Sequence, residues 1–178
     1  MNRRFVESDS GAAAVEFAII SPLLLAIFAF MIDFGMALWV KIDLEQALSS
    51  AANYAIVSAT NVSASGGATL AAQLGAIAPA RLDVGVTVNN GPTYSRNGGA
   101  ATTGGTASAA DACYCPATGS NNSVTWGSSV ACGSTCANGG QAGRFVAITM
   151  SRTYSPLFAS YGYVRNGAVT ASSLVRAQ

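Results

Sequence analysis

The sequence contains no histidine and few charged residues, and these two features exclude several classes of function. Without histidine, the chain has no His-based catalytic triad, no histidine metal ligand and no imidazole proton shuttle. Charged residues make up 10% of the 178 residues, well below the roughly 25% of ordinary soluble domains. The net charge is +1, so there is no surplus of Lys and Arg to neutralise phosphates. We therefore expect no nucleic-acid partner, and the composition indicates an anchored or exported protein.

One long apolar run near the N-terminus has the length and composition of a membrane-spanning helix. Residues 12–40 read AAAVEFAIISPLLLAIFAFMIDFGMALWV, and only Glu16 and Asp33 interrupt them with charge. A helix over residues 17–40 would be about 36 Å long, which is enough to cross a hydrocarbon core of about 30 Å. The sequence therefore predicts one membrane-spanning helix with membrane lipid as a partner, and it places the two carboxylates near opposite edges of the bilayer.

Basic residues on the two sides of this run predict its orientation. Arg3 and Arg4 precede the run and Lys41 follows it closely, which favours a cytoplasmic N-terminus and an extracytoplasmic remainder. Removal of the whole run as a secretory signal peptide fits less well, because the run is longer than the roughly 7–15 residues of a signal core and no small-residue motif closes it. We expect a cytoplasmic leader at residues 1–11, followed by a transmembrane and amphipathic helix at 12–59.

The helical pattern continues beyond the membrane. Residues 41–59 contain no Gly or Pro, and apolar side chains recur on one face three and four residues apart. These side chains belong to Leu44, Leu48, Ala51, Ala52, Ala55 and Ile56. The pattern predicts one helix from about Val15 to Ala59, with its first half in lipid and its second half packed on an extracytoplasmic domain at residues 60–178.

The extracytoplasmic domain combines one further helical pattern with three strand patterns. Residues 68–78 have the composition of a short helix that ends at Pro79. Apolar and polar side chains alternate at 81–89, 144–154 and 167–176, as expected for half-buried strands. The expected fold class is therefore α+β, with a long N-terminal helix packed on a small antiparallel sheet.

All four cysteines lie in a stretch that has little else to hold it together. Residues 89–143 are rich in Gly, Ser, Asn, Thr and Ala, and we expect them to form a long loop that buries little apolar surface. The cysteines follow the pattern C-x-C-x16-C-x3-C, at Cys113, Cys115, Cys132 and Cys136. This spacing lacks the CxxC knuckles of a zinc site, so we expect disulfides and no metal.

Two disulfide pairings remain open. A bond between Cys113 and Cys115 is disfavoured by geometry. The alternatives are Cys113–Cys132 with Cys115–Cys136, or Cys113–Cys136 with Cys115–Cys132. Either would suit an oxidising compartment.

The junction before the apolar run resembles a known processing site. It reads Ser10-Gly11-Ala12-Ala13-Ala14-Val15-Glu16-Phe17, a small residue followed by an apolar stretch with one Glu at its fifth position. This junction resembles that of type IV prepilin-like proteins. The Glu-Phe pair and the rest of the run, with Pro22 inside it, resemble the TadE-like proteins of the tight-adherence (Tad, or Flp) branch. The strand, Tyr-Ser-Pro-Leu segment and short strand over 144–178 are also similar to that family.

The resemblance implies a processing step and an assembly residue. A prepilin peptidase would cut after Gly11 and leave Ala12 as the new N-terminus, although many type IV pilins begin with Phe at that position. Glu16, followed by Phe17, would pair with the free amine of Ala12 in a neighbouring subunit, where a low dielectric strengthens the attraction. The alternative is that Glu16 caps the helix start by facing the N-terminal dipole and cytosolic water.

The function that the resemblance implies is structural. The protein resembles a minor pilin or pseudopilin that serves the assembly of a Flp, type IVb-like pilus by helix packing. Its implied partners are other pilin-like subunits and the inner-membrane assembly machinery, and its implied place is the bacterial inner membrane, with a periplasmic domain, or the extracellular pilus. The alternative is an inner-membrane-anchored periplasmic scaffold or binding module that enters no filament.

Catalysis is not expected from these residues. The sequence shows no nucleophile with a base and no phosphate-binding loop, and the carboxylates Asp83 and Asp111 are too sparse for an acid–base pair. We therefore expect neither a cofactor nor a small-molecule substrate. Five aromatic residues would either form an adhesive surface or, as scattered aromatics usually do, pack against the domain: Tyr94, Tyr114, Trp126, Tyr161 and Tyr163.

Overall fold

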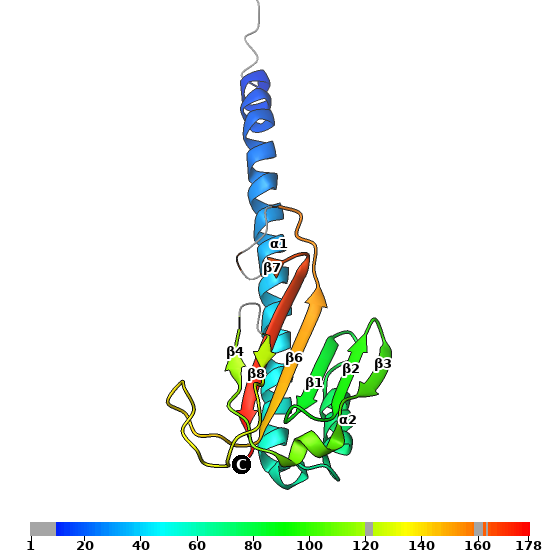
Figure 1. Cartoon of the computed structure of the whole chain (residues 1–178). Helices are drawn as coiled ribbons and strands as arrows, with labels where there is room; N and C mark the ends of the chain where they lie inside the picture. The colour runs from blue at the N-terminus through cyan, green and yellow to red at the C-terminus, as the bar shows by residue number, and fades with distance from the viewer. Residues whose placement is uncertain (1–9, 120–122, 159–161, 163) are drawn as a thin grey trace, which may run out of the picture.

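A single long helix carries the rest of the domain along its C-terminal half (Figure 1). The computed structural model describes residues 10–119, 123–158, 162 and 164–178, so most of the expected leader lies outside the described residues. The helical elements are α1 (Ser10–Val57), η1 (Ala59–Asn61), α2 (Gly67–Ile77) and η2 (Ala107–Asp111). The strands are β1 (Asp83–Val88), β2 (Thr93–Asn97), β3 (Ala100–Gly104), β4 (Ala117–Thr118), β5 (Val124–Thr125), β6 (Phe145–Thr153), β7 (Val164–Arg165) and β8 (Ala168–Arg176).

The first helix is continuous through both of the halves that the sequence predicts. α1 has 48 residues, which corresponds to a length of about 72 Å, and it continues through Pro22. Its buried residues begin at Asp33 and recur every three or four positions. They are Asp33, Ala37, Val40, Leu44, Leu48, Ala51 and Ala55. The predicted apolar face is therefore confirmed at Leu44, Leu48, Ala51 and Ala55. Ala52 is half-buried, and Ile56 lies about 100° away from this line and is 54% exposed.

The sheet has six antiparallel strands in the order β3-β2-β1-β6-β8-β7. α1 packs on β6 and β8, while α2 packs on β1 and β2. Both helices lie on the same face of the sheet (Figure 1). Between the helices and this face lies one core, in which Leu44 of α1 and Leu70 and Leu74 of α2 are fully buried. The structure therefore confirms the expected α+β arrangement.

The alternating patterns identify the central strands correctly. In β1 the side chains of Val84, Val86 and Val88 are almost fully buried. Met150, Ile148 and Val146 of β6 lie directly opposite them in the register and are also buried. Since side chains on one face of a strand recur every second residue, these two sets form a single apolar layer against the helices.

A hairpin occupies part of the segment that the sequence interpretation assigned to a long loop. β2 and β3 pair through the register Asn97↔Ala100, and the two residues between them, Gly98 and Gly99, have φ values of +56° and +87°. Two consecutive positive φ angles define the tight turn that matches the twist of a hairpin. The loop prediction was wrong here because every residue of β3 is exposed, so β3 has no buried face to give an apolar alternation.

One glycine permits the close approach of α2 to this hairpin. A Cβ atom at Gly75 would lie on the ring of Tyr94, so any larger residue there would push the helix away from the sheet. Beside this contact, the guanidinium of Arg96 donates hydrogen bonds to the carbonyls of Gly75, Ala78 and Pro79. A cation at this end satisfies orphan carbonyls and faces the negative end of the helix dipole.

Candidate assembly site

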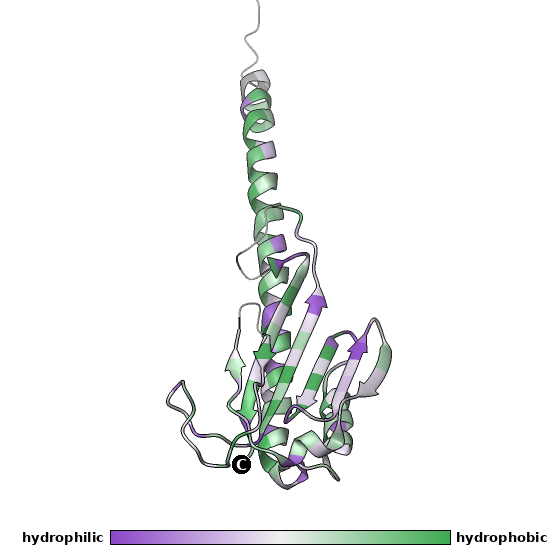
Figure 2. Ribbon diagram, in the orientation of Figure 1, coloured by the Kyte–Doolittle hydropathy of each residue, from purple (hydrophilic) through white to green (hydrophobic). Residues whose placement is uncertain are grey.

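The N-terminal half of α1 has no buried residue from Ala13 to Ile32. These 20 residues span about 30 Å, close to the thickness of a bilayer's hydrocarbon core. The helix is long and apolar enough to cross a membrane, with a mean hydropathy of 2.4 in its most apolar window. Figure 2 shows this half in hydrophobic colours where it projects beyond the sheet. We refer to residues 13–32 as the bare segment.

The residues expected to act in processing and assembly lie at the start of this helix. Gly11 and Ala12 belong to α1, which begins at Ser10. Glu16 is exposed and lies beyond the first turn, where the helix dipole no longer acts strongly. Among the described residues it has no hydrogen-bond or ion-pair partner. Phe17 beside it is 70% exposed. The domain therefore leaves both side chains free for contacts with other molecules.

Asp33 marks the point where the domain begins to cover α1, and sequence reasoning missed its role. The residue is 4% exposed. Its carboxylate accepts a hydrogen bond from the Tyr154 hydroxyl at 2.7 Å and from the backbone N–H of Leu157 at 3.1 Å and of Phe158 at 3.4 Å. These donors belong to residues 154–158, which we call the docking segment. Because a buried carboxylate is costly unless it is hydrogen-bonded, these donors explain how it can be buried here.

Aromatic rings reinforce the docking segment on its side toward the bare segment. Phe30 and Phe34, one turn apart on α1, are stacked with ring centroids 6.2 Å apart. The ring of Phe158 meets Phe30 edge-on at 6.0 Å. Such pairs add to the stability gained by burying their area. The Tyr-Ser-Pro-Leu motif thus ends β6 and attaches the chain to α1 at the level where the bare segment ends.

The opposite end of the domain carries two disulfides. Cys113 bonds to Cys132 and Cys115 bonds to Cys136, with Cα–Cα distances of 5.1 and 5.6 Å. Both distances fall in the range that an unstrained bridge requires. The first of the two open pairings is therefore the correct one, and the bridges hold the described part of the loop over 113–136 in place of a large apolar core. We call residues 113–136 the disulfide loop.

Buried Asn89 joins the disulfide loop to the sheet. Its side-chain amide donates to the carbonyls of Ala110 at 2.8 Å and Ala112 at 2.6 Å, and its side-chain oxygen accepts from the N–H of Phe145 at 3.1 Å. The residue is fully buried and has a φ of +50°, which asparagine adopts more readily than most residues. One side chain therefore connects the β1–β2 turn, the approach to Cys113 and the start of β6.

Replacing Asn89 by alanine is expected to lower the free energy of unfolding by about 3 kcal/mol. The change leaves the N–H of Phe145 and the carbonyls of Ala110 and Ala112, which are buried or partly buried, without these partners, and it adds strain at a positive φ. Chemical denaturation of the full chain in detergent micelles measures this loss. Asn90→Ala is the matched control, because Asn90 has a φ of +57° but an exposed side chain. Equal losses in the two variants would contradict a role for the Asn89 side chain.

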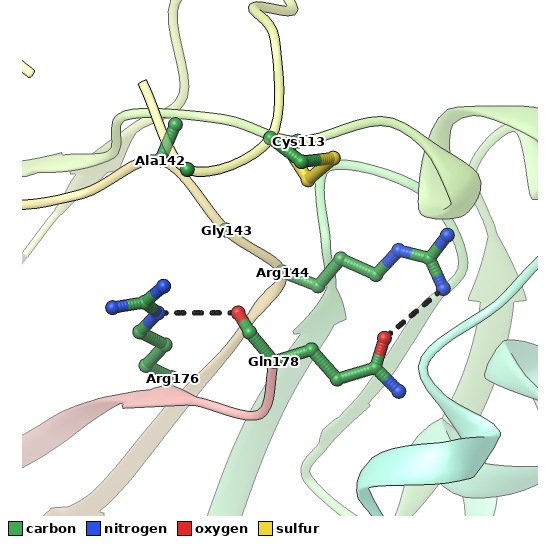
Figure 3. A pocket seen from close by; sticks show the side chains of 8 residues that line it. Cys113, Ala142, Gly143, Arg144, Arg176 and Gln178 are labelled. Carbon is green, nitrogen blue, oxygen red and sulfur yellow. Dashed lines mark hydrogen bonds between the residues drawn. A yellow bond between two sulfur atoms is a disulfide. The ribbon is translucent and has the colours of Figure 1, made fainter. Parts of the chain in front are cut away.

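A small pocket lies where the disulfide loop meets the sheet (Figure 3). It is lined by Cys113, Ala142, Gly143, Arg144, Arg176 and Gln178, among others. The guanidinium of Arg144 donates to the carbonyls of Val62 and Asp111, and Figure 3 shows its contact with Gln178. The polar groups of this pocket therefore serve as a structural junction.

The carboxylates and aromatics singled out in the sequence also have structural contacts. Asp83 accepts a hydrogen bond from the N–H of Gly98, and Asp111 accepts one from the N–H of Ala64. Tyr114 and Trp126 meet edge-on at 6.0 Å. Tyr94 packs against the core, whereas Tyr161 and Tyr163 lie outside the described residues. The aromatics that the structure describes thus pack within the domain.

Comparison with known proteins finds a family match over the N-terminal segment. The model of the family described as TadE-like protein matches residues 11–53. No curated protein and no solved structure gives a match. The matched residues include the expected cleavage position, Glu16, Asp33 and the first buried turns of α1, while the similarity expected over 144–178 lies outside the match. Residues 11–53 are therefore similar to TadE-like proteins.

Proposed function

We propose that the protein is a minor pilin or pseudopilin of a tight-adherence pilus and that it works as a non-catalytic structural subunit. Its partners would be other pilin-like subunits and the inner-membrane assembly machinery, and a prepilin peptidase would process it between Gly11 and Ala12. The TadE-like match over residues 11–53 supports the pilus association.

The bare segment is the observation that carries this proposal. The bare segment continues directly into the C-terminal half of α1, which is packed on the sheet. The hydrogen-bonded helix is unbroken, so it transmits force and orientation between the bare segment and the domain. Apart from Glu16 and Ser21, its side chains are apolar, and none of them is buried by the domain; this suits lipid before assembly and the helices of neighbouring subunits afterwards.

The two disulfides support an extracytoplasmic position for the domain. Disulfides persist in oxidising compartments such as the bacterial periplasm and are rare in the cytosol. Both bridges lie beside the start of β6, near Arg144 and Phe145, whereas the end of β6 leads into the docking segment beside the bare segment. An N-terminus in the cytoplasm and a domain in the periplasm would agree with this placement.

Replacing Glu16 by alanine is expected to reduce the fraction of the protein in sheared filaments by about tenfold while leaving the domain folded and the chain in the membrane. An exposed carboxylate among apolar side chains is costly in lipid unless it has a partner. In an assembled bundle, the N-terminal amine of a neighbour would provide that partner, and a tenfold loss corresponds to about 1.4 kcal/mol. Quantitative immunoblots of sheared, membrane and soluble fractions measure the effect.

Glu45→Ala supplies the control on the same helix. Glu45 is exposed and pairs with Lys41 at 3.7 Å within its own chain, so its removal is expected to leave the filament fraction unchanged. Equal filament fractions in wild type and Glu16→Ala, together with an uncleaved N-terminus, would favour a membrane-anchored periplasmic scaffold instead.

A further inference from the structure

Hydrogen bonds fix the docking segment beside position 33 of α1. The N–H groups of Leu157 and Phe158 donate to the Asp33 carboxylate, which fixes the backbone of these residues beside position 33 of the helix. The ring of Phe158 contacts Phe30, which lies in the last turn of the bare segment. Residues 157 and 158 are therefore the part of the docking segment that meets the end of the bare segment.

The spacing of the two carboxylates on α1 places position 33 relative to a bilayer. Glu16 and Asp33 are 17 positions apart on one continuous helix, which corresponds to about 26 Å. A hydrocarbon core of about 30 Å is thicker than this separation, and a tilted helix would span even less of it. When Glu16 lies at the cytosolic boundary, Asp33 and the docking segment lie at the opposite boundary between acyl chains and headgroups.

The chemistry of the docking segment suits this position. Leu157 is 82% exposed and Phe158 is 42% exposed, and the ring of Phe158 meets Phe30 of the bare segment. The Asp33 carboxylate is screened from its surroundings by three donors from the segment. Trp39, 61% exposed, lies about 9 Å further along the helix, where aromatic residues gather at membrane interfaces.

We propose that the docking segment is a membrane-contacting element of the domain. Leu157 and Phe158 insert into the boundary between headgroups and acyl chains of the leaflet that faces the domain, and Asp33 holds them at this depth. The occupant of this surface is the lipid, and the contact fixes how far α1 enters the membrane before assembly. This inference rests on the proposed membrane-spanning role of α1.

Depth measurements with nitroxide labels test the proposal. All four cysteines are in disulfides, so Leu157→Cys supplies one free thiol for labelling in the full chain. Ile27→Cys in the bare segment is the reference for the membrane interior, and Thr102→Cys in exposed β3 is the reference for water. Each variant is placed as a single copy in nanodiscs of phosphatidylethanolamine and phosphatidylglycerol.

The readout is the collision rate of each label with molecular oxygen, which enters lipid, and with a water-soluble nickel chelate. We expect the oxygen-to-nickel ratio at position 157 to be several-fold above that at 102 and below that at 27. If the ratio at position 157 equals that at position 102 while the label at position 27 lies in lipid, the membrane contact of the docking segment is overturned and the membrane-spanning role of α1 is not. Low collision rates with both reagents at 157 would mean that protein covers it and would also overturn the inference. A water-accessible label at 27 would instead refute the membrane-spanning role.

Discussion

Replacing Asp33 by alanine is expected to release the docking segment from α1, with about a hundredfold loss of hydrogen-exchange protection at the amides of Leu157 and Phe158. Both amides donate to the Asp33 carboxylate, and hydrogen bonds to charged groups contribute about 1.5–3 kcal/mol each. The Tyr154 hydroxyl also donates to the Asp33 backbone carbonyl at 2.7 Å, which alanine retains. A net loss of about 3 kcal/mol corresponds to the hundredfold change.

Asp43→Ala is the matched control for this measurement. Asp43 lies on the same helix, but its carboxylate pairs with the guanidinium of Arg81, which is about half exposed; this contact raises the pKa of Arg81 above its usual value. Its removal is expected to leave the two amides of the docking segment protected. Unchanged protection in Asp33→Ala would show that the aromatic contacts with Phe30 hold the segment without the carboxylate.

Removing both disulfides is expected to unfold the disulfide loop while the helix–sheet core stays folded. Each bridge closes a loop of about 20 residues, for which chain entropy predicts about 3 kcal/mol of stabilisation. Among the described residues, Cys113 and Cys136 of the loop form a small buried cluster with Ala142, which lies just outside the loop, and this cluster is separate from the main core. A variant with all four cysteines replaced by alanine should therefore lose protection in the loop by two or more orders of magnitude.

Hydrogen exchange followed by mass spectrometry separates the two regions. Amides of β1 and β6 are expected to remain protected in the four-alanine variant, because their side chains pack on the helices. Ser134→Ala, which removes a single exposed hydrogen bond in the same loop, is expected to have little effect. Loss of protection in β1 and β6 together with the loop would contradict the independence of the two clusters.

The long helix and the central strands could be predicted because local patterns determine them. Leu44 and Leu48 follow the helical period, and Val84, Val86 and Val88 alternate as a half-buried strand requires. Burial of one face of a helix or strand against a neighbouring element stabilises the fold, so the period of that face is visible in the sequence. The family match over residues 11–53 falls on the same strongly patterned region.

The remaining features depend on partners that are distant in sequence. Asp33 contacts Tyr154, 121 positions away, and Asn89 contacts Phe145, 56 positions away. No local sequence pattern around Asp33 or Asn89 predicts these contacts. The hairpin turns did leave a local signal. Asn166-Gly167 and Gly98-Gly99 both have positive φ angles, and such dipeptides between short runs of β-forming residues indicate hairpins.

The placement of β6 and β8 against α1 determines when this molecule is able to fold during biosynthesis. Asp33 leaves the ribosome 121 residues before Tyr154, an interval of about 6–24 s at common rates of synthesis. Throughout that time Leu44 and Leu48 have no sheet to cover them. If the bare segment spans a membrane as proposed, translation order delivers it to the bilayer first, and the domain then folds onto a helix that is already tethered.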